Sequence, residues 1–336
     1  MEKIYIILIA IVLLTLALGL GLGLGLKKEE NGDRGGSESV LWAAVGRDTN
    51  QLLFSLDGQN WQVASGSSFG TAGFGVAYGL SSDKTTPIWS AVGRDINKLL
   101  FSLDGRSWQV TSGSSFEPSG SGFGVAYGLS SDVTTPIWSA VGSGTDKIIF
   151  SLDGQSWQVA SGSSFSNFGT GVAYGLSSDK TTPIWSAVGN GTNKILFSLD
   201  GQSWQVASGS SFGNAGTGVA YGLSSDKTTP IWSAVGSGTN ELLFSLDGQN
   251  WQVASGNSFG TAGDGAGVAY GLSSDKTTPI WSAVGSGTNQ LLFSLDGQNW
   301  QVASGNSFGT AGEGVASSEP NPALVGTSAN PFSNFS

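Results

Sequence analysis

The stretch Phe54-Ser-Leu-Asp-Gly-Gln-Asn-Trp61 occurs in six closely similar copies, and its repetition decides the fold of this chain. Successive copies are separated by 47 or 49 residues. The other five copies begin at Phe101, Phe150, Phe197, Phe244 and Phe293. A near-constant period of this length is typical of proteins built from stacked or radially arranged repeats. The sequence therefore predicts a repeat architecture with six units.

Each repeat contains four short segments with strand character, separated by turn-rich segments. In the second repeat these segments are Gly75–Leu80, Ile88–Val92, Lys98–Leu103 and Trp108–Thr111. Four short strands about ten residues apart, repeated at this period, are typical of propeller blades. We therefore expect an all-β protein, a six-bladed β-propeller of four-stranded antiparallel blades.

The repeated motif is expected to form the turn between two adjacent strands. Aspartate accepts hydrogen bonds from turn N–H groups, glycine supplies a backbone conformation that other residues resist, and tryptophan fills the space between sheets. Because the motif recurs in every repeat, a structural role is favoured over a catalytic one. The structural residues are Ser55, Asp57, Gly58, Trp61, Ser102, Asp104, Gly105, Trp108, Ser151, Asp153, Gly154, Trp157, Ser198, Asp200, Gly201, Trp204, Ser245, Asp247, Gly248, Trp251, Ser294, Asp296, Gly297 and Trp300.

The motif resembles the Asp-box (BNR) repeat of sialidase-like propellers, although that box usually has one more residue between aspartate and tryptophan. The longer pattern resembles uncharacterised repeat proteins of large DNA viruses and bacteria, over about residues 40–318. The resemblance implies that the box joins the third and fourth strands of a blade. The array would then start on a second strand, Leu41–Val45, and end on a first strand, Gly314–Ser317. This C-terminal strand would complete the first blade and close the ring.

The segments outside the array have different compositions. Ile4–Leu26 is uncharged and apolar, and as a helix it would span roughly 34 Å, enough to cross a membrane. We expect residues 1–26 to form one N-terminal transmembrane helix, with a cleaved signal peptide as the alternative. Residues 27–39 are expected to be a flexible linker, and residues 319–336 a disordered tail. The propeller, residues 40–318, would then lie on an extracellular, lumenal or virion surface.

Composition excludes several classes of function. The net charge of −10 argues against nucleic acid as a partner, because phosphate binding needs clustered lysine and arginine. The chain has no histidine and no cysteine, so it lacks the commonest general base and any thiolate. Asp146, Asp264 and Glu313 could offer oxygen ligands to Ca²⁺. Acidic loop residues more commonly keep a surface soluble, so we expect neither a metal site nor a cofactor.

An enzyme is not expected. The sialidases that the repeats resemble use three arginines and a tyrosine–glutamate pair, whereas this chain has only Arg34, Arg47, Arg94 and Arg106. Arg34 lies in the linker and Arg106 in a motif turn, so no triad can form. The tyrosines from Tyr78 to Tyr270 occupy equivalent repeat positions and are expected in the core. A sialidase-like glycosidase remains only as an unlikely alternative.

Variation among the repeats is concentrated in the loops that join one blade to the next. These joining loops, from the motif tryptophan to the next Gly-Val-Ala, carry all the length differences between repeats. Variable loops on a rigid scaffold commonly carry binding specificity. We therefore expect a glycan or a protein to bind on the face that carries them, at Arg47, Phe74, Arg94, Phe123 and Phe168. The alternative is a structural surface or envelope protein without a soluble ligand.

Overall fold

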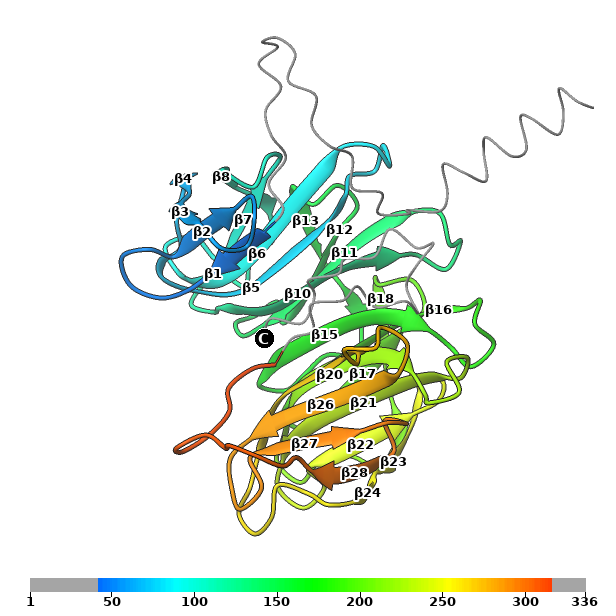
Figure 1. The fold of residues 1–336 in the computed structure, drawn as a ribbon. Coiled ribbons are helices and arrows are strands. Elements are labelled where there is room, and N and C mark those ends of the chain that lie inside the picture. Colours follow the sequence, from blue (N-terminus) through cyan, green and yellow to red (C-terminus); the bar gives the residue numbers. More distant parts are fainter. Residues whose placement is uncertain (1–41, 316–336) are drawn as a thin grey trace, which may run out of the picture. The chain divides into compact units, whose positions relative to one another are not determined.

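The computed structural model describes residues 42–315, and all regular secondary structure in this range is β-strand (Figure 1). The predicted anchor or signal peptide, the linker and the tail lie outside the described residues. Within residues 42–315, no helix is long and apolar enough to cross a membrane. The predicted all-β class is confirmed for the described part of the chain.

Each repeat forms an antiparallel meander. The first comprises β1 (Trp42–Val45), β2 (Leu52–Ser55) and β3 (Trp61–Val63). In the next five, the first strands are β5 (Gly70–Leu80), β10 (Gly122–Leu129), β15 (Phe168–Leu176), β20 (Ala215–Leu223) and β25 (Gly265–Leu272). Their second strands are β6 (Pro87–Asp95), β11 (Pro136–Gly142), β16 (Pro183–Asn190), β21 (Pro230–Ser237) and β26 (Pro279–Gly285). Their third strands are β7 (Leu99–Ser102), β12 (Ile148–Ser151), β17 (Ile195–Ser198), β22 (Leu242–Ser245) and β27 (Leu291–Ser294). Their fourth strands are β8 (Ser107–Val110), β13 (Ser156–Val159), β18 (Ser203–Val206), β23 (Asn250–Val253) and β28 (Asn299–Val302).

The strand pairing repeats with the same register. In the third meander, Tyr127 lies opposite Trp138, and Trp138 lies opposite Ser151. Two meanders share one larger sheet only because Asn190 of β16 also pairs with Ala215 of β20. The predicted four-stranded antiparallel units are confirmed for the second to sixth repeats. The number of blades in a ring and its closure remain predictions.

A short strand from each of five repeats crosses to the next repeat. The five are β4 (Ser65–Gly66), β9 (Ser112–Gly113), β14 (Ser161–Gly162), β19 (Ser208–Gly209) and β24 (Ser255–Gly256), and we call them clasps. β4 pairs in parallel with β8, where the Ser65 N–H donates to Arg106 O and the Ser67 N–H donates to Trp108 O, both at 2.8 Å. The other four clasps pair in the same way with β13, β18, β23 and β28. The clasps therefore tie neighbouring meanders together at their outer edges.

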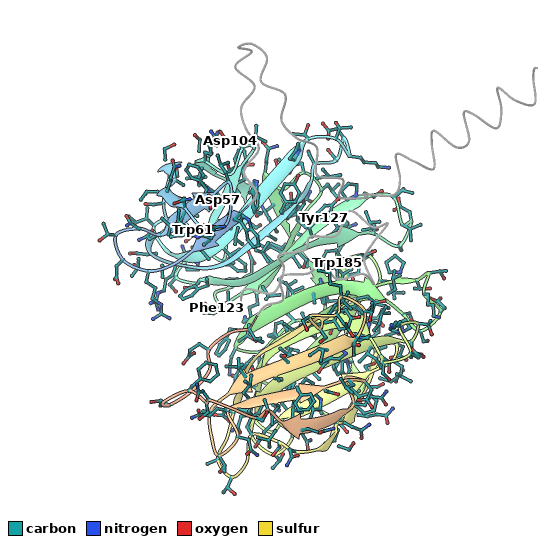
Figure 2. All side chains as sticks on the ribbon, in the orientation of Figure 1. Asp57, Trp61, Asp104, Phe123, Tyr127 and Trp185 are labelled. Atoms are coloured by element: carbon teal, nitrogen blue, oxygen red, sulfur yellow. The ribbon has the colours of Figure 1, made fainter. Side chains whose placement is uncertain are left out.

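The core lies between neighbouring meanders, whose first strands contact one another in chain order. Glycine permits this approach, because a Cβ atom at Gly128 would lie 2.2 Å from the Tyr174 ring of the next meander. Trp185 is completely buried, and its ring centroid is 5.1 Å from that of Tyr174 (Figure 2). Its indole N–H donates to the backbone oxygen of Leu129 at 3.1 Å, in the preceding meander. The buried Trp138, Trp232 and Trp281 form the same hydrogen bond to the preceding meander, so burial and hydrogen bonding act together at four of these joints between neighbouring meanders.

The motif forms the turn between third and fourth strands, as predicted. In the third repeat, the backbone N–H groups of Gln155 and Ser156 donate to Asp153 Oδ1 at 2.8 and 2.7 Å. The Ser151 hydroxyl donates to the same oxygen at 2.9 Å and accepts from the Gly154 N–H. Gly154 has a φ of 72°, which favours glycine. The predicted roles of serine, aspartate and glycine are confirmed.

Five of the six motif tryptophans are buried, as the sequence predicts for side chains that fill the space between sheets. Trp108, Trp157, Trp204, Trp251 and Trp300 are only 1–2% exposed. Trp61, in contrast, is 41% exposed. The physical reason is that each buried tryptophan lies under a clasp from the preceding repeat, whereas no clasp covers Trp61 in the described part of the chain. The expectation that Trp61 fills the space between two sheets is therefore wrong for this structure.

Replacing Asp153 with alanine is expected to lower the free energy of unfolding by about 1–3 kcal/mol. The substitution leaves the N–H groups of Gln155 and Ser156 without their acceptor. Urea unfolding of the variant beside wild type measures the loss. An unchanged midpoint would contradict the role assigned to the motif aspartate.

In two kinds of turn, hydrogen bonds hold the pKa of an aspartate side chain below its usual range. Burial alone would raise the pKa of Asp153, but hydrogen bonds from Ser156, Gln155 and Ser151 outweigh it and lower the pKa. In the turn between first and second strands, hydrogen bonds from the side chain and backbone of Thr86 and the backbone of Thr85 lower the pKa of Asp83 to about 2. The same turn in the fourth repeat lowers the pKa of Asp179 to about 2. These carboxylates are ionised at neutral pH.

Stability is expected to be constant from pH 7 to 5 and to fall as the pH drops from about 4 towards about 2. A carboxyl whose pKa is lower in the folded state stabilises it above the unfolded pKa, and this contribution disappears as pH falls through the folded pKa. The chain has no histidine that would titrate between pH 5 and 8. Thermal melts followed by circular dichroism across this range test the prediction. A large loss already between pH 7 and 5 would contradict it.

Candidate functional site

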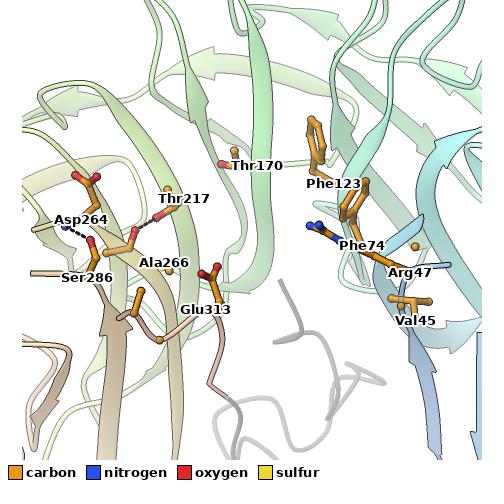
Figure 3. A pocket seen from close by; sticks show the side chains of 15 residues that line it. Val45, Arg47, Phe74, Phe123, Thr170, Thr217, Asp264, Ala266, Ser286 and Glu313 are labelled. Atoms are coloured by element: carbon orange, nitrogen blue, oxygen red, sulfur yellow. Dashed lines mark hydrogen bonds between the residues drawn. The ribbon is translucent and has the colours of Figure 1, made fainter. Parts of the chain in front are cut away.

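One residue from each repeat lines a single pocket of about 890 Å³ (Figure 3). Each lies between two glycines, immediately before the recurring Gly-Val-Ala segment. This segment lies in a first strand in five copies, whereas residues 314–315 of the sixth copy are not a strand. In chain order the six residues are Phe74, Phe123, Thr170, Thr217, Ala266 and Glu313. We call this the Gly-x-Gly position. The two flanking glycines are the same in all six copies, whereas this position is phenylalanine in two copies, threonine in two, alanine in one and glutamate in one.

One wall of the pocket combines aromatic and cationic groups. The Phe74 and Phe123 ring centroids are 5.4 Å apart. The guanidinium carbons of Arg47 and Arg94 lie 5.7 and 5.6 Å from the centroid of Phe74, within reach of cation–π attraction. Both arginines are exposed, and neither forms an ion pair with a carboxylate in residues 42–315. Of the two, Arg47 lines the pocket, so its hydrogen-bond donors are available to a ligand there.

The opposite wall is acidic and polar. Figure 3 shows Asp264, Ser286 and Glu313 across the pocket from Arg47 and Phe74. The Thr217 hydroxyl hydrogen-bonds to Val235 O at 3.1 Å and to Gly265 O at 2.6 Å, and so joins two meanders. Thr170 bridges its meander to the next in the same way. Because both hydroxyls direct their protons to the backbone, they can offer a ligand only an acceptor.

The structure brings the five predicted binding residues into one chain of contacts. Arg47, Phe74 and Phe123 line the pocket. Arg94 instead lines a neighbouring cavity of about 510 Å³, together with Lys98 and Pro118. The Phe168 ring is 6.0 Å from that of Phe123, but Phe168 does not line the pocket. It lies two residues before the Gly-x-Gly position, where it pairs with Asn190.

The sequence analysis identifies only two of the six residues at the Gly-x-Gly position as binding residues, Phe74 and Phe123. Thr170, Thr217 and Ala266 line the pocket but were not predicted as site residues, and Glu313 was considered only as a calcium ligand. The signal was present: aligning the repeats on Gly-Val-Ala places these residues in register with Phe74 and Phe123. Asp264 and Glu313 share the pocket, whereas Asp146 does not line it. Within residues 42–315, no group of three or more acidic side chains is placed to hold a metal ion.

In three repeats, the residue before the third strand fixes a joining loop to the scaffold. Lys98 is 7% exposed, and its Nζ lies 2.5 Å from Glu117 Oε1 in the following joining loop. At the equivalent position, Gln51 Oε1 accepts from the Gly70 N–H at 3.0 Å, and Glu241 Oε2 accepts from the Phe259 N–H at 2.8 Å. The loops beside the pocket are therefore held in place before any ligand binds, which lowers the entropic cost of binding.

Four repeat tyrosines lie in the core, as predicted. Tyr127, Tyr174, Tyr221 and Tyr270 are buried and face tryptophans of their own meanders. Burial raises the pKa of Tyr270 to about 12, so its hydroxyl stays protonated at neutral pH. Tyr78 in the second repeat is more exposed. None of these tyrosines lines the pocket.

Comparison with solved structures finds similar folds at low sequence identity. A GH74 enzyme from Niastella koreensis is 18% identical, with a TM-score of 0.44, over 78% of this chain and 37% of that one. YCF48 from Cyanidioschyzon merolae is 17% identical, with a TM-score of 0.46, over 79% of this chain and 85% of that one. YCF48 bound to D1 peptide is 18% identical, with a TM-score of 0.43, over 79% and 81%.

This chain thus spans only about a third of the GH74 enzyme's length. No protein-family model matches the chain, and no curated protein does.

Proposed function

We propose that this protein is a non-catalytic recognition or adhesion module that binds a glycan or a protein in the Gly-x-Gly pocket. The observation that carries the proposal is the asymmetry of that pocket. Six nearly identical repeats place different side chains at the Gly-x-Gly position, which lines the pocket in every copy. A scaffold of equal units does not require different side chains at equivalent positions, whereas a site that binds one ligand in one orientation does.

The two walls suit a ligand with distinct polar and apolar parts. Phe74 and Phe123 offer a half-buried aromatic surface on which a sugar ring or an apolar side chain can stack. Arg47 supplies hydrogen-bond donors beside that surface, and Asp264 and Glu313 supply acceptors across the pocket. A hydroxyl-rich glycan or a peptide segment meets these requirements, whereas nucleic acid does not suit a chain with a net charge of −10.

The proposed architecture is a ring of six blades closed by the C-terminal strand. In support, a Cβ atom at Gly267 would lie 3.3 Å from the Cα of Gly314. A Cβ atom at Gly218 would lie 3.5 Å from the Cα of Gly267, a similar approach, as a further first strand at Gly314 would require. Completion of the first blade would cover the edge of β1 that no strand within residues 42–315 pairs with. The anchor at residues 4–26 would hold this ring at an extracellular, lumenal or virion surface.

A structural surface or envelope role is the second candidate, and the outer strands favour it. The valine that ends each fourth strand is exposed in every repeat, as Val110 (50%) and Val159 (49%) illustrate. The motif leucines Leu103, Leu152 and Leu199 are also 38–49% exposed. A uniform apolar rim of this kind suits contacts between copies in a lattice. Ordered arrays in electron micrographs of the purified protein, without any ligand, would favour this role.

Glycan and peptide arrays probed with the full chain in detergent, with and without Ca²⁺, test the recognition function. The proposal predicts a selective signal that is lost when Phe74 and Phe123 are both changed to alanine. A blank array from correctly folded protein, or a signal that the two substitutions leave unchanged, would contradict binding in this pocket.

A further inference from the structure

The five clasps share one geometry, which makes a sixth position recognisable. At each clasp glycine, a Cβ atom would lie only 2.1–2.3 Å from the backbone oxygen of the motif tryptophan beside it. The glycines also share a φ of 84–89°, which favours glycine. The clasp site therefore accepts an extended Ser-Gly segment and no larger residue at the second position. Each site lies on the outer edge of a fourth strand.

Both halves of a sixth clasp are present but apart. Ser304 and Gly305 follow β28 at the same distance in sequence at which β4 follows β3. Gly305 has a φ of 99°, yet a Cβ atom there would meet nothing within 4 Å in the described part of the chain. The matching acceptor is Trp61, which is 41% exposed where its five counterparts are 1–2% exposed.

Between the first and the last repeat, a glycine and a phenylalanine that are in contact in other repeats also lie apart. A Cβ atom at Gly93 or Gly236 would lie 2.5 Å from the ring of the phenylalanine that precedes the adjoining first strand. Gly46 is the equivalent glycine of the first repeat, and its nearest neighbour would be Asn50 O at 3.7 Å. Phe308 is the phenylalanine in the matching position, and it is 42% exposed, whereas Phe69, Phe116 and Phe259 are completely buried.

We propose that Ser304–Gly305 docks on Asn60–Trp61 of the same chain as a sixth clasp, and that this latch sets the width of the ligand pocket. Ser304 lies opposite Asn60 and Gly305 opposite Trp61, in the register of β24 on β28. Docking buries the Trp61 indole and brings Phe308 against Gly46. The latch deepens the function proposed above, because it rests on the six-bladed ring and regulates that same pocket.

The chain itself identifies the occupant. The pairing partners Ser304-Gly305 and Asn60-Trp61 repeat the residue types of the internal pair Ser255-Gly256 and Asn299-Trp300. Gly314 comes nine positions after Gly305, as Gly75 comes nine positions after Gly66, so the segment has the length needed to reach its site. An acceptor on the same chain is also met at far higher effective concentration than one on a second copy.

The latch bears on the pocket because the pocket walls come from both sides of this joint. Val45, Gly46 and Arg47 belong to the first repeat, whereas Ala311, Gly312 and Glu313 follow the last clasp segment. Docking of Ser304–Gly305 fixes these two groups relative to each other. Release of the latch frees the wall that carries Glu313 from the wall that carries Arg47, and so widens the pocket.

Disulfide trapping in the full chain, solubilised in detergent, tests the docked register. The chain has no cysteine, so Asn60→Cys with Ser304→Cys introduces the only thiols. The matched control is Asn299→Cys with Ser255→Cys, at an internal clasp where Ser255 Oγ contacts Asn299 Oδ1. We expect an intrachain disulfide, seen on a non-reducing gel, in the same yield as the control. Disulfide-linked dimers, or no disulfide while the control forms, would overturn the proposal.

Stability and thiol accessibility give independent measurements. Gly305→Val should lower the urea midpoint as much as Gly256→Val does, because both place a side chain against a tryptophan carbonyl. A bulky maleimide should then label Thr217→Cys in the pocket several-fold faster in the Gly305→Val background, while labelling of Leu152→Cys in a motif turn stays constant. No change in midpoint overturns the latch, and an unchanged labelling rate overturns its control of the pocket. These results do not depend on any ligand, so a blank array leaves them unaffected.

Discussion

Replacing Trp185 with alanine is expected to lower the free energy of unfolding by about 3–5 kcal/mol. The indole is completely buried between two meanders, so the substitution leaves a cavity in a joint. It also removes the hydrogen bond to Leu129 O and the packing against Tyr174. A domain of this kind is commonly stable by only about 5–15 kcal/mol, so one such joint carries a large share of the total.

Urea unfolding followed by circular dichroism measures this loss. The matched control is Leu199→Ala, because Leu199 is 38% exposed and its truncation removes little buried surface. We expect the control to stay within about 0.5–1 kcal/mol of wild type. Equal losses for the two variants would contradict the account in which tryptophans at the joints hold the meanders together.

Replacing Gly175 with alanine is expected to lower the free energy of unfolding by about 3 kcal/mol, at the upper end of the range for an overpacked core. A Cβ atom there would lie 2.2 Å from the Tyr221 ring, and this ring is held in place by its packing against Trp232. One methyl group therefore forces two first strands apart. The expected result is a clear fall in the urea midpoint with the β-sheet circular dichroism spectrum retained.

A double-mutant cycle separates the clash from a general effect of removing glycine. In the background of Tyr221→Ala, the contact with the Tyr221 ring is gone, so Gly175→Ala should cost clearly less than it does beside the intact ring. The same cost in both backgrounds would show that the approach of Gly175 to Tyr221 does not limit the packing.

The sequence predicts the structure within each meander better than the contacts between neighbouring meanders. The six copies of Ser-Leu-Asp-Gly-x-x-Trp predict the turn at Asp153, because aspartate and glycine satisfy that turn locally. The clasps were not predicted, because two residues such as Ser65–Gly66 carry no periodicity and their partner lies in the next repeat. Trp61 shows the same limit, since its exposure depends on a segment far away in the sequence.

The candidate site was predicted in part, for a similar reason. Phe74, Phe123 and Arg47 stand out because large or charged residues are rare among the glycines of the joining loops. Thr170, Thr217 and Ala266 are unremarkable in composition, and only their shared place in the strand register brings them to the pocket. Phe168 looked equivalent to the other phenylalanines, but its offset of two residues places it beside the pocket rather than in its lining.

The central claim is that this protein binds its ligand in the pocket lined by one residue from each repeat. The most direct test is the calorimetric affinity of wild type, Phe123→Ala and Leu152→Ala for the strongest ligand found on the arrays. Leu152 is an exposed apolar residue of a motif turn and does not line the pocket, so it is a matched control. The account predicts that Phe123→Ala weakens binding at least tenfold, about 1.4 kcal/mol, and that Leu152→Ala leaves it unchanged. Unchanged affinity in Phe123→Ala, or an equal loss in both variants, would contradict it.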